Sequence, residues 1–260
     1  MVKETRILMG MPVTVEIADA FDAKTAIDAV FNYFTYIDDT FSTFKETSEI
    51  TKINNGLVEK KDFSQDMKTV FELAEKTKQE TNGYFNIVNN KGVCDPSGIV
   101  KGWAIQHAAQ LLCDKGFKNH YVEAGGDIQV FGLPTQVLAQ AGKNENHLSW
   151  SVGIKNPFNT QEIIKVVYLK NNEGIATSGT YERGAHIYNP KNRKETLAEI
   201  MSITVIAKNV YEADRIATAA FAMQRKGIRF IEDLPGFEAY VIDNQGIATM
   251  TNGFEKYTIP

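Results

Sequence analysis

The order in which helix and strand patterns follow one another constrains the fold of this chain more than any other feature. Apolar residues spaced three and four positions apart predict four long amphipathic helices, at residues 22–44, 64–81, 97–112 and 210–223. Strand patterns come in runs, above all between residues 121 and 207. Because strict β–α–β alternation is missing, we expect an α+β fold with mostly antiparallel sheets flanked by helices, and not a doubly wound parallel sheet.

Local signals predict where several elements begin and end. Residues 5–17 alternate apolar and polar side chains after Gly10, which predicts one strand, and Asp22 is a plausible N-cap for the first long helix. The pair Asn82-Gly83 predicts the end of the second helix. Further strands are expected at residues 121–131 (interrupted by Gly125-Gly126), 149–155, 162–169, 173–177, 185–188, 200–207, 238–243 and 247–250, with a short helix near 225–233. Since no repeat or linker divides the chain, we expect one domain over residues 1–260, with residues 133–148 as a surface excursion.

Charge and cysteine content exclude several classes of protein. Lys and Arg number 28 and Asp and Glu number 32, so the formal net charge is −4 and the chain lacks the basic footprint of a nucleic-acid or membrane-surface binder. The two cysteines, Cys94 and Cys113, form no CxxC pair, which favours a reducing compartment. The sequence shows no signal-peptide pattern and no stretch near the roughly 20 apolar residues that span a bilayer. We therefore expect a cytoplasmic protein without nucleic-acid partners or stable membrane insertion.

Three short motifs combine residue types that suit phosphate or metal chemistry. In DPSGIVKG (residues 95–102) a turn leads into a helix whose first N–H groups suit a phosphate, and Lys101 adds positive charge; the alternative is a capped helix with a surface lysine. Asp214 and Thr218 share one helix face, where a carboxylate and a hydroxyl suit Mg²⁺. Alternatively, Thr218 bonds the Asp214 carbonyl and Asp214 forms an exposed ion pair. In AGGD (residues 124–127) the glycines allow close backbone approach, but a β-bulge with a solvated Asp127 is the better interpretation of this motif alone.

Histidine placement and absent motifs narrow the reaction class. His186 lies in ATSGTYERGAHIYNP (residues 176–190), framed by Gly and Ser, where an imidazole could accept a proton from a hydroxyl nucleophile; the alternative is a structural histidine. The chain contains no Gly-x-Ser-x-Gly elbow and no GxGxxG that opens a helix after a strand. Serine hydrolases of the elbow type and classical nucleotide-fold dehydrogenases therefore lose their main support.

Taken in order, these pieces resemble the ApbE family, the FAD:protein FMN transferases. The matching stretches are LMGMPVTVEI (8–17), FSTFKETSEITKIN (41–54), TNGYFNI (81–87), DPSGIVKGWAI (95–105), YVEAGGDI (121–128), WSVGIKNP (150–157), IATSGTYERGAHIYNP (175–190), MSITVIA (201–207) and ADRIATAAF (213–221). The resemblance covers nearly the whole chain. It implies a T-fold-like α+β architecture with FAD bound in a cleft between two lobes.

The resemblance also implies the reaction and the residues that carry it. With Mg²⁺, or alternatively Mn²⁺, such enzymes split the pyrophosphate of FAD, transfer FMN to a Thr or Ser hydroxyl of an acceptor protein and release AMP. The acceptor motif is similar to Asp-x-x-Ser/Thr-Gly-Ala-Thr, which this chain does not contain. By residue-wise match, His186 would deprotonate the acceptor hydroxyl. The matching metal ligands are Asp214, Thr218 and the backbone at Gly98 and Ala217. The matching flavin-nucleotide contacts are Met9, Tyr84, Phe85, Asn86, Asp95, Lys101, Ser178, Gly179 and Ile187.

Several departures from the family pattern leave other activities open. Asn86 stands where relatives often have Asp, Phe44 where they have Tyr, and NPKNR (189–193) where DPxTG is common. Only about eight residues bridge the stretches ending at 87 and starting at 95, where many relatives carry a long segment. Two alternatives follow. One is an FAD pyrophosphatase that yields FMN and AMP, and the other is a non-catalytic FAD-binding protein.

Overall fold

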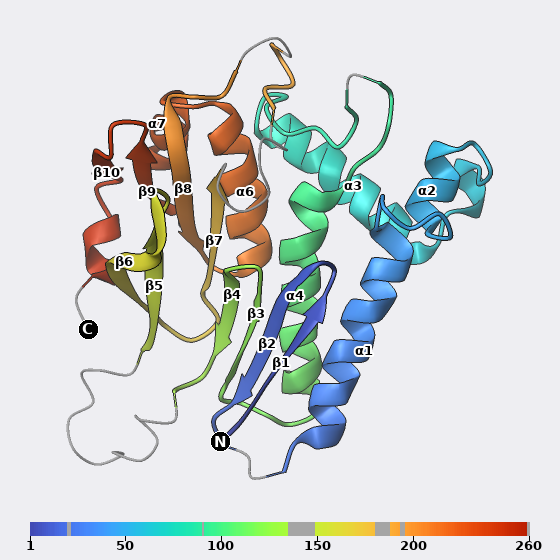
Figure 1. Cartoon of the computed structure of the whole chain (residues 1–260), viewed down its shortest axis with the longest axis horizontal. Helices are drawn as coiled ribbons and strands as arrows, with labels where there is room; N and C mark the ends of the chain where they lie inside the picture. The colour runs from blue at the N-terminus through green and yellow to red at the C-terminus, as the bar shows by residue number, and fades with distance from the viewer. Residues whose placement is uncertain (20–21, 90, 135–148, 180–187, 193–195, 259–260) are drawn as a thin grey trace.

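A single large antiparallel sheet forms the centre of the molecule. The computed structural model describes residues 1–19, 22–89, 91–134, 149–179, 188–192 and 196–258 (Figure 1). The sheet has eight strands in the order β1-β2-β3-β4-β7-β8-β9-β10, and every described strand pairing is antiparallel. The strands are β1 (Val2–Leu8), β2 (Met11–Ile17), β3 (His120–Ala124), β4 (Asp127–Phe131), β7 (Gly174–Gly179), β8 (Ile200–Ala207), β9 (Glu238–Asp243) and β10 (Ala248–Met250). The predicted α+β class with antiparallel pairing is confirmed.

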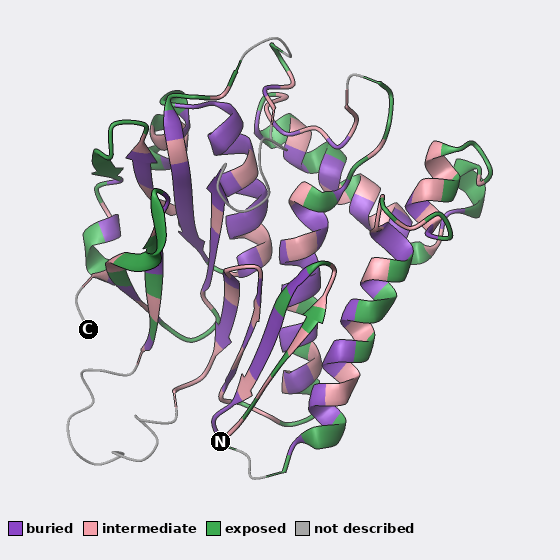
Figure 2. Cartoon of the chain, viewed as in Figure 1, coloured by how far each residue is buried: buried purple, intermediate pink, exposed green. Residues whose placement is uncertain are grey.

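Helices cover one face of this sheet. The described helices are α1 (Lys24–Phe41), α2 (Glu49–Asn54), α3 (Gln65–Glu80), α4 (Ser97–Asp114), α6 (Val210–Ala222) and α7 (Lys226–Glu232). Two short 3₁₀ turns, η1 (Lys60–Asp62) and η3 (Phe254–Tyr257), lie elsewhere in the chain. Helices α1, α4 and α6 lie side by side behind the strands (Figure 1). One apolar core joins α1, α3 and α4 to β2 and β3, and a second joins α6 and α7 to β8 and β9. Figure 2 shows buried residues concentrated on the strands and on the sides of the helices that face them.

The opposite face of the sheet is covered over its second half by a separate hairpin. Strands β5 (Trp150–Asn156) and β6 (Asn159–Leu169) pair only with each other among the described strands. Together with η3 they enclose a third apolar core against β4, β7 and β8, which includes the aromatic side chains of Trp150, Phe254 and Tyr257. Among the described helices, none combines the length and apolar character needed to cross a membrane.

Helices α4 and α6 approach each other closely because two glycines on α4 face α6. A Cβ atom added at Gly102 would lie 2.6 Å from the Cβ of Asp214, and one at Gly98 would lie 3.1 Å from the Cγ2 of Thr218. The two glycines are four positions apart, as are their partners, so one face of each helix is involved. This contact places the first turn of α4 beside the middle of α6.

Two local predictions are wrong, and one short helix was not predicted. Residues 5–17 form two strands, because Met9 and Gly10 both adopt positive φ (54° and 72°) and make the turn of a hairpin. Helix α1 begins after Ala23 and has no side-chain cap, although the Asp22 carboxylate accepts a hydrogen bond from the Lys24 N–H. Helix α2 has six residues, of which only Ile50 and Ile53 are apolar, so it is too short to show a helical period in the sequence.

Other boundaries are confirmed. Ser64 caps α3 by accepting a hydrogen bond from the Met67 N–H, and Asn82 and Gly83 follow the helix with positive φ. The prediction of a strand at 185–188 falls mostly on residues outside the described ranges, as does most of the excursion at 133–148.

Candidate functional site

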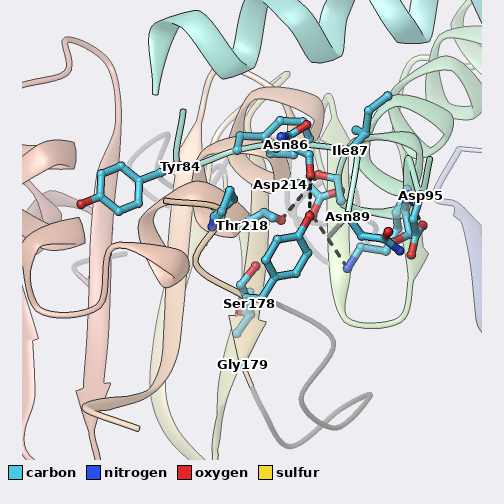
Figure 3. A pocket seen from close by; sticks show the side chains of 16 residues that line it. Tyr84, Asn86, Ile87, Asn89, Asp95, Ser178, Gly179, Asp214 and Thr218 are labelled. Carbon is cyan, nitrogen blue, oxygen red and sulfur yellow. Dashed lines mark hydrogen bonds and ion pairs between the residues drawn. The ribbon is translucent and has the colours of Figure 1, made fainter. Parts of the chain in front are cut away.

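A cavity of about 280 Å³ opens where the first turn of α4, the middle of α6 and the end of β7 meet. Its lining residues come from segments far apart in the sequence: Tyr84, Phe85, Asn86, Ile87, Asn89, Asp95, Ser97, Gly98, Lys101, Thr177, Ser178, Gly179, Tyr188, Pro190, Asp214 and Thr218. Figure 3 shows Asp214, Thr218 and Ser178 in the middle of this group, with Tyr84 and Asp95 at opposite ends. The cavity has both polar and apolar walls, as is usual for small-molecule sites.

Helix α6 contributes two oxygen-bearing side chains to the cavity. Asp214 is 3% exposed, and its Oδ2 accepts a hydrogen bond of 2.8 Å from the backbone N–H of Gly102. In a regular helix that N–H would donate to the carbonyl of Gly98. The Gly98 carbonyl oxygen lies 3.5 Å from the Thr218 Oγ1. A carboxylate, a hydroxyl and a backbone carbonyl therefore gather at the contact between α4 and α6. The alternatives of an exposed Asp214 ion pair and of a Thr218 hydroxyl bonded to its own helix are not what the structure shows.

Lys101 and Asp127 form a buried ion pair behind the cavity. The Lys101 Nζ lies 2.7 Å from Asp127 Oδ2 and 3.9 Å from Asp214 Oδ1. Asp127 is completely buried, and its Oδ1 accepts a hydrogen bond of 3.0 Å from the Thr177 N–H. The prediction of a solvated Asp127 in a β-bulge is therefore wrong, because Gly125 and Gly126 make a hairpin turn that directs Asp127 inward. The alternative of a surface Lys101 is equally wrong, since that side chain is 12% exposed.

The loop before α4 is held in place by hydrogen bonds to its backbone. Asn54 on α2 donates to the Cys94 carbonyl (2.9 Å) and accepts from the Cys94 N–H (2.8 Å). The Asp95 carboxylate accepts a hydrogen bond of 3.0 Å from the N–H of Ser97, the first residue of α4. Burial raises the pKa of the Cys94 thiol, so this cysteine is a poor thiolate nucleophile.

A second set of contacts fixes α3 against α6 next to the site. Arg215 is almost fully buried and forms ion pairs with Glu212 on its own helix and with Glu80 at the end of α3 (2.5 Å). On the other wall, the Tyr188 hydroxyl donates to the carbonyl of Val88 (3.1 Å). The Arg215 ion pair holds the end of α3, just before the loop at residues 84–89, and the Tyr188 hydrogen bond holds that loop directly.

Most of the residues that the sequence analysis singled out lie together at this cavity. They are Tyr84, Phe85, Asn86, Asp95, Gly98, Lys101, Ser178, Gly179, Asp214 and Thr218. Met9 lies in the β1–β2 turn and Ala217 is fully buried in α6, and neither lines the cavity. His186 and Ile187 are outside the described residues.

Sequence reasoning did not select seven residues that the structure brings to the site. Six of them line the cavity, and the seventh, Asp127, pairs with Lys101. The six lining residues are Ile87, Asn89, Ser97, Thr177, Tyr188 and Pro190. Asp127 had a signal in the AGGD motif, but the burial of its carboxylate depends on a partner 26 positions earlier in the chain. Nothing in the sequence marked Tyr188 as a site residue, because a tyrosine beside Asn and Pro is common in surface turns.

Comparisons of this chain with known proteins all find members of one family. The sequence profile described as "ApbE family" matches residues 9–94 and 89–241. Two curated relatives, each named "FAD:protein FMN transferase", come from Vibrio cholerae serotype O1 and Escherichia coli K12. The first is 28% identical over 172 residues, covering 63% of this chain and 47% of the relative. The second is 27% identical over 160 residues, covering 58% of this chain and 43% of the relative. The matched region thus spans about half the length of these relatives.

Solved structures show the same fold along the whole chain. The ApbE protein of Thermotoga maritima superposes with a TM-score of 0.83 at 22% identity, covering 100% of this chain and 99% of that one. The flavin transferase ApbE of Vibrio cholerae superposes with a TM-score of 0.80 at 19% identity, covering 98% of both chains. At identities of 22% and 19%, the similarity to these two structures shows a shared fold.

Proposed function

The chain belongs to the ApbE family, and we propose that it is a single-domain, Mg²⁺-dependent enzyme that transfers FMN from FAD to a hydroxyl group of an acceptor protein and releases AMP. The observation that carries this proposal is the convergence of Asp214, Thr218 and the Gly98 carbonyl at one cavity, beside Lys101 and the N-terminus of α4. The relatives named FAD:protein FMN transferase support the same reaction.

The donor set fits a hard divalent cation. Carboxylate, hydroxyl and carbonyl oxygens are the ligands that Mg²⁺ prefers, and Mn²⁺ accepts the same set. The described residues hold no cluster of three or more His, Cys, Asp or Glu side chains, so a site for a softer metal has no support there. Asp214, Thr218 and the backbone of Gly98 and Ala217 would hold the ion. When bound, Mg²⁺ neutralises charge on the pyrophosphate and on the phosphoryl group in transit.

Protein residues then bind and orient the FAD. We assign the flavin-nucleotide contacts to the loop at residues 84–86, Asp95, Ser178 and Gly179, and, on the family resemblance alone, to Met9 and Ile187. Lys101 supplies positive charge toward the phosphates, and the N-terminus of α4 adds the favourable end of a helix dipole. This arrangement stabilises negative charge where the P–O bond breaks.

The transfer step exchanges one P–O bond for another. The acceptor hydroxyl oxygen attacks the FMN phosphorus, the bond to the bridging oxygen breaks, and AMP leaves with that electron pair. We propose that His186 takes the hydroxyl proton, an assignment that rests on the family resemblance. The acceptor would carry a motif similar to Asp-x-x-Ser/Thr-Gly-Ala-Thr.

We also propose a cytoplasmic location for this protein. The free thiols of Cys94 and Cys113 support it, because thiols stay reduced in that compartment.

Mass spectrometry of an acceptor domain tests this proposal. After incubation with this protein, FAD and Mg²⁺, we expect the acceptor to gain the mass of one FMN. Asp214→Asn should abolish the gain, while Asp114→Asn, an exposed change at the far end of α4, should not. AMP release at a rate independent of the acceptor would indicate the pyrophosphatase instead. FAD that stays intact in the presence of Mg²⁺ would indicate a binding protein.

A further inference from the structure

The buried carboxylate of Asp127 has no part in the chemistry proposed above, although it is the nearest charged neighbour that the structure gives Lys101. Asp127 is fully buried at the start of β4, directly after the Gly125-Gly126 turn. Burying a carboxylate is costly unless it is paired and hydrogen-bonded. The position of Asp127 therefore needs a reason beyond the turn itself.

Both oxygens of Asp127 are engaged, each with a different element. Oδ1 accepts a hydrogen bond of 3.0 Å from the Thr177 N–H on β7, which fixes the orientation of the carboxylate. Oδ2 faces the Lys101 Nζ at 2.7 Å. Because β7 holds one oxygen, the other stays directed at α4.

The Lys101 ammonium lies between two carboxylates at unequal distances. It is 2.7 Å from Asp127 Oδ2 and 3.9 Å from Asp214 Oδ1. Asp214 is the carboxylate of the proposed metal site, and a cation that moved onto it would compete with the metal ion for the same oxygen. The contact with Asp214 is the longer of the two, so the ammonium lies closer to Asp127 than to the carboxylate of the proposed metal site.

We propose that Asp127 is a positioning residue that holds the Lys101 ammonium away from Asp214 and so keeps the Asp214 carboxylate available to the divalent cation. This inference rests on the proposed metal site. Without the Asp127 charge, Lys101 moves toward Asp214, and the metal then has to displace an ion pair in order to bind. Asp127 thereby allows a lysine that serves the phosphates and a carboxylate that serves the metal to occupy one cavity.

Direct measurement of Mn²⁺ binding tests this inference without any activity assay. The Mn²⁺ dissociation constant is measured by electron paramagnetic resonance on the full chain without FAD. Asp127→Asn keeps the side-chain shape and an oxygen for the Thr177 N–H. We expect it to weaken Mn²⁺ binding by about tenfold or more, the equivalent of about 1.4 kcal/mol. Adding Lys101→Met to Asp127→Asn removes the competing ammonium, so the double variant should bind Mn²⁺ nearly as tightly as the wild type.

The outcomes separate this inference from the proposed function. If the wild type binds Mn²⁺ and Asp127→Asn binds it equally well, the positioning role is wrong while the metal site stands. If the double variant stays as weak as Asp127→Asn, Lys101 is not the competitor and the inference also fails. If the wild type and Asp214→Asn bind Mn²⁺ alike, the metal site itself is wrong, and the inference falls with it.

One further variant protects the test against misfolding. Circular dichroism and thermal melting establish whether Asp127→Asn folds. If it does not, Lys101→Met alone is compared with the wild type, and we expect Mn²⁺ binding at least as tight. Weaker binding by Lys101→Met would overturn the proposal, because the lysine would then support the metal rather than compete with it.

Discussion

The contact between Gly102 on α4 and Asp214 on α6 leads to a prediction in which two energetic effects oppose each other. Gly102 lies inside a helix, where replacement of Gly by Ala is favourable by about 0.8–1.0 kcal/mol through helix propensity alone. The added Cβ, however, would lie 2.6 Å from the Cβ of Asp214 and 2.8 Å from the carbonyl oxygen of Val210. Neither atom is the end of a flexible side chain, so the helices themselves must separate.

The magnitudes decide the sign of the effect. Normal carbon–carbon contacts are about 3.5–4.0 Å, so α4 and α6 must move apart by about 1 Å. Overpacking of this kind costs about 1–3 kcal/mol. Separation also stretches the Gly102 N–H bond to the Asp214 carboxylate, and hydrogen bonds to charged groups contribute about 1.5–3 kcal/mol. We therefore expect Gly102→Ala to lower the free energy of unfolding by about 2–4 kcal/mol in spite of the propensity gain.

Urea denaturation at 25 °C measures this difference, with Gly98→Ala as the matched control. At Gly98 the added Cβ would meet the Thr218 Cγ2 at 3.1 Å and the Phe85 Cε2 at 3.3 Å, contacts that small side-chain movements relieve. We expect this control to stay within about 1 kcal/mol of the wild type. If Gly102→Ala is as stable as the wild type, the close approach of α4 and α6 does not constrain position 102 and the reasoning is refuted.

Three further predictions concern residues around the site. Arg215→Met leaves the Glu212 carboxylate without its buried partner, and urea denaturation should show a loss of about 3 kcal/mol; a loss under 1 kcal/mol would contradict a structural role for the pair. Burial lowers the pKa of His120 to about 4, whereas the unfolded chain protonates this group near 6.5. The unfolded state thus binds the extra proton, and stability should fall by up to about 3 kcal/mol from this group as the pH drops from 6.5 toward 4. His120→Asn should flatten that dependence, and an unchanged slope would exclude His120 as its source. Asn54→Leu removes two hydrogen bonds to the Cys94 backbone, so hydrogen exchange at the Cys94 amide should accelerate by about tenfold, with unaltered exchange as the opposing result.

Local chemistry explains why several elements could be predicted. Helix α3 is bounded by Ser64, whose hydroxyl accepts the Met67 N–H, and by Asn82 and Gly83, which tolerate positive φ. Each of these signals acts within four residues of the helix end, so the amino-acid order suffices to reveal them. The same holds for α6, whose predicted range of 210–223 differs from Val210–Ala222 by one residue. The family resemblance then gathered the scattered motifs into one expected cavity, and ten of the fourteen residues carried over line it.

The hairpin at Met9 and Gly10 shows where local reasoning fails. Apolar and polar residues alternate through β2, after Gly10, whereas β1 has four consecutive polar residues at positions 3–6. The turn itself uses two residues with positive φ, Met9 and Gly10, and only Gly10 is of a type that favours this conformation. The alternation after Gly10 therefore predicted one strand, and the turn that divides residues 5–17 into two strands had little local signal.

Local signals were enough to predict the class of the fold, most helix boundaries and the chemical types at the candidate site. Contacts between distant segments were needed to establish which charged groups around that site are buried and which of them pair. The ion pair that buries Asp127 joins it to Lys101, 26 positions earlier in the chain. The hydrogen bond that the Gly102 N–H donates to Asp214 joins residues 112 positions apart. Whether a carboxylate is solvated or buried depends on which distant segment packs over it, and the free energy of an ionic contact depends steeply on that burial. A motif specifies which groups are present, and the packing of α4 beside α6 on the sheet specifies which of them meet.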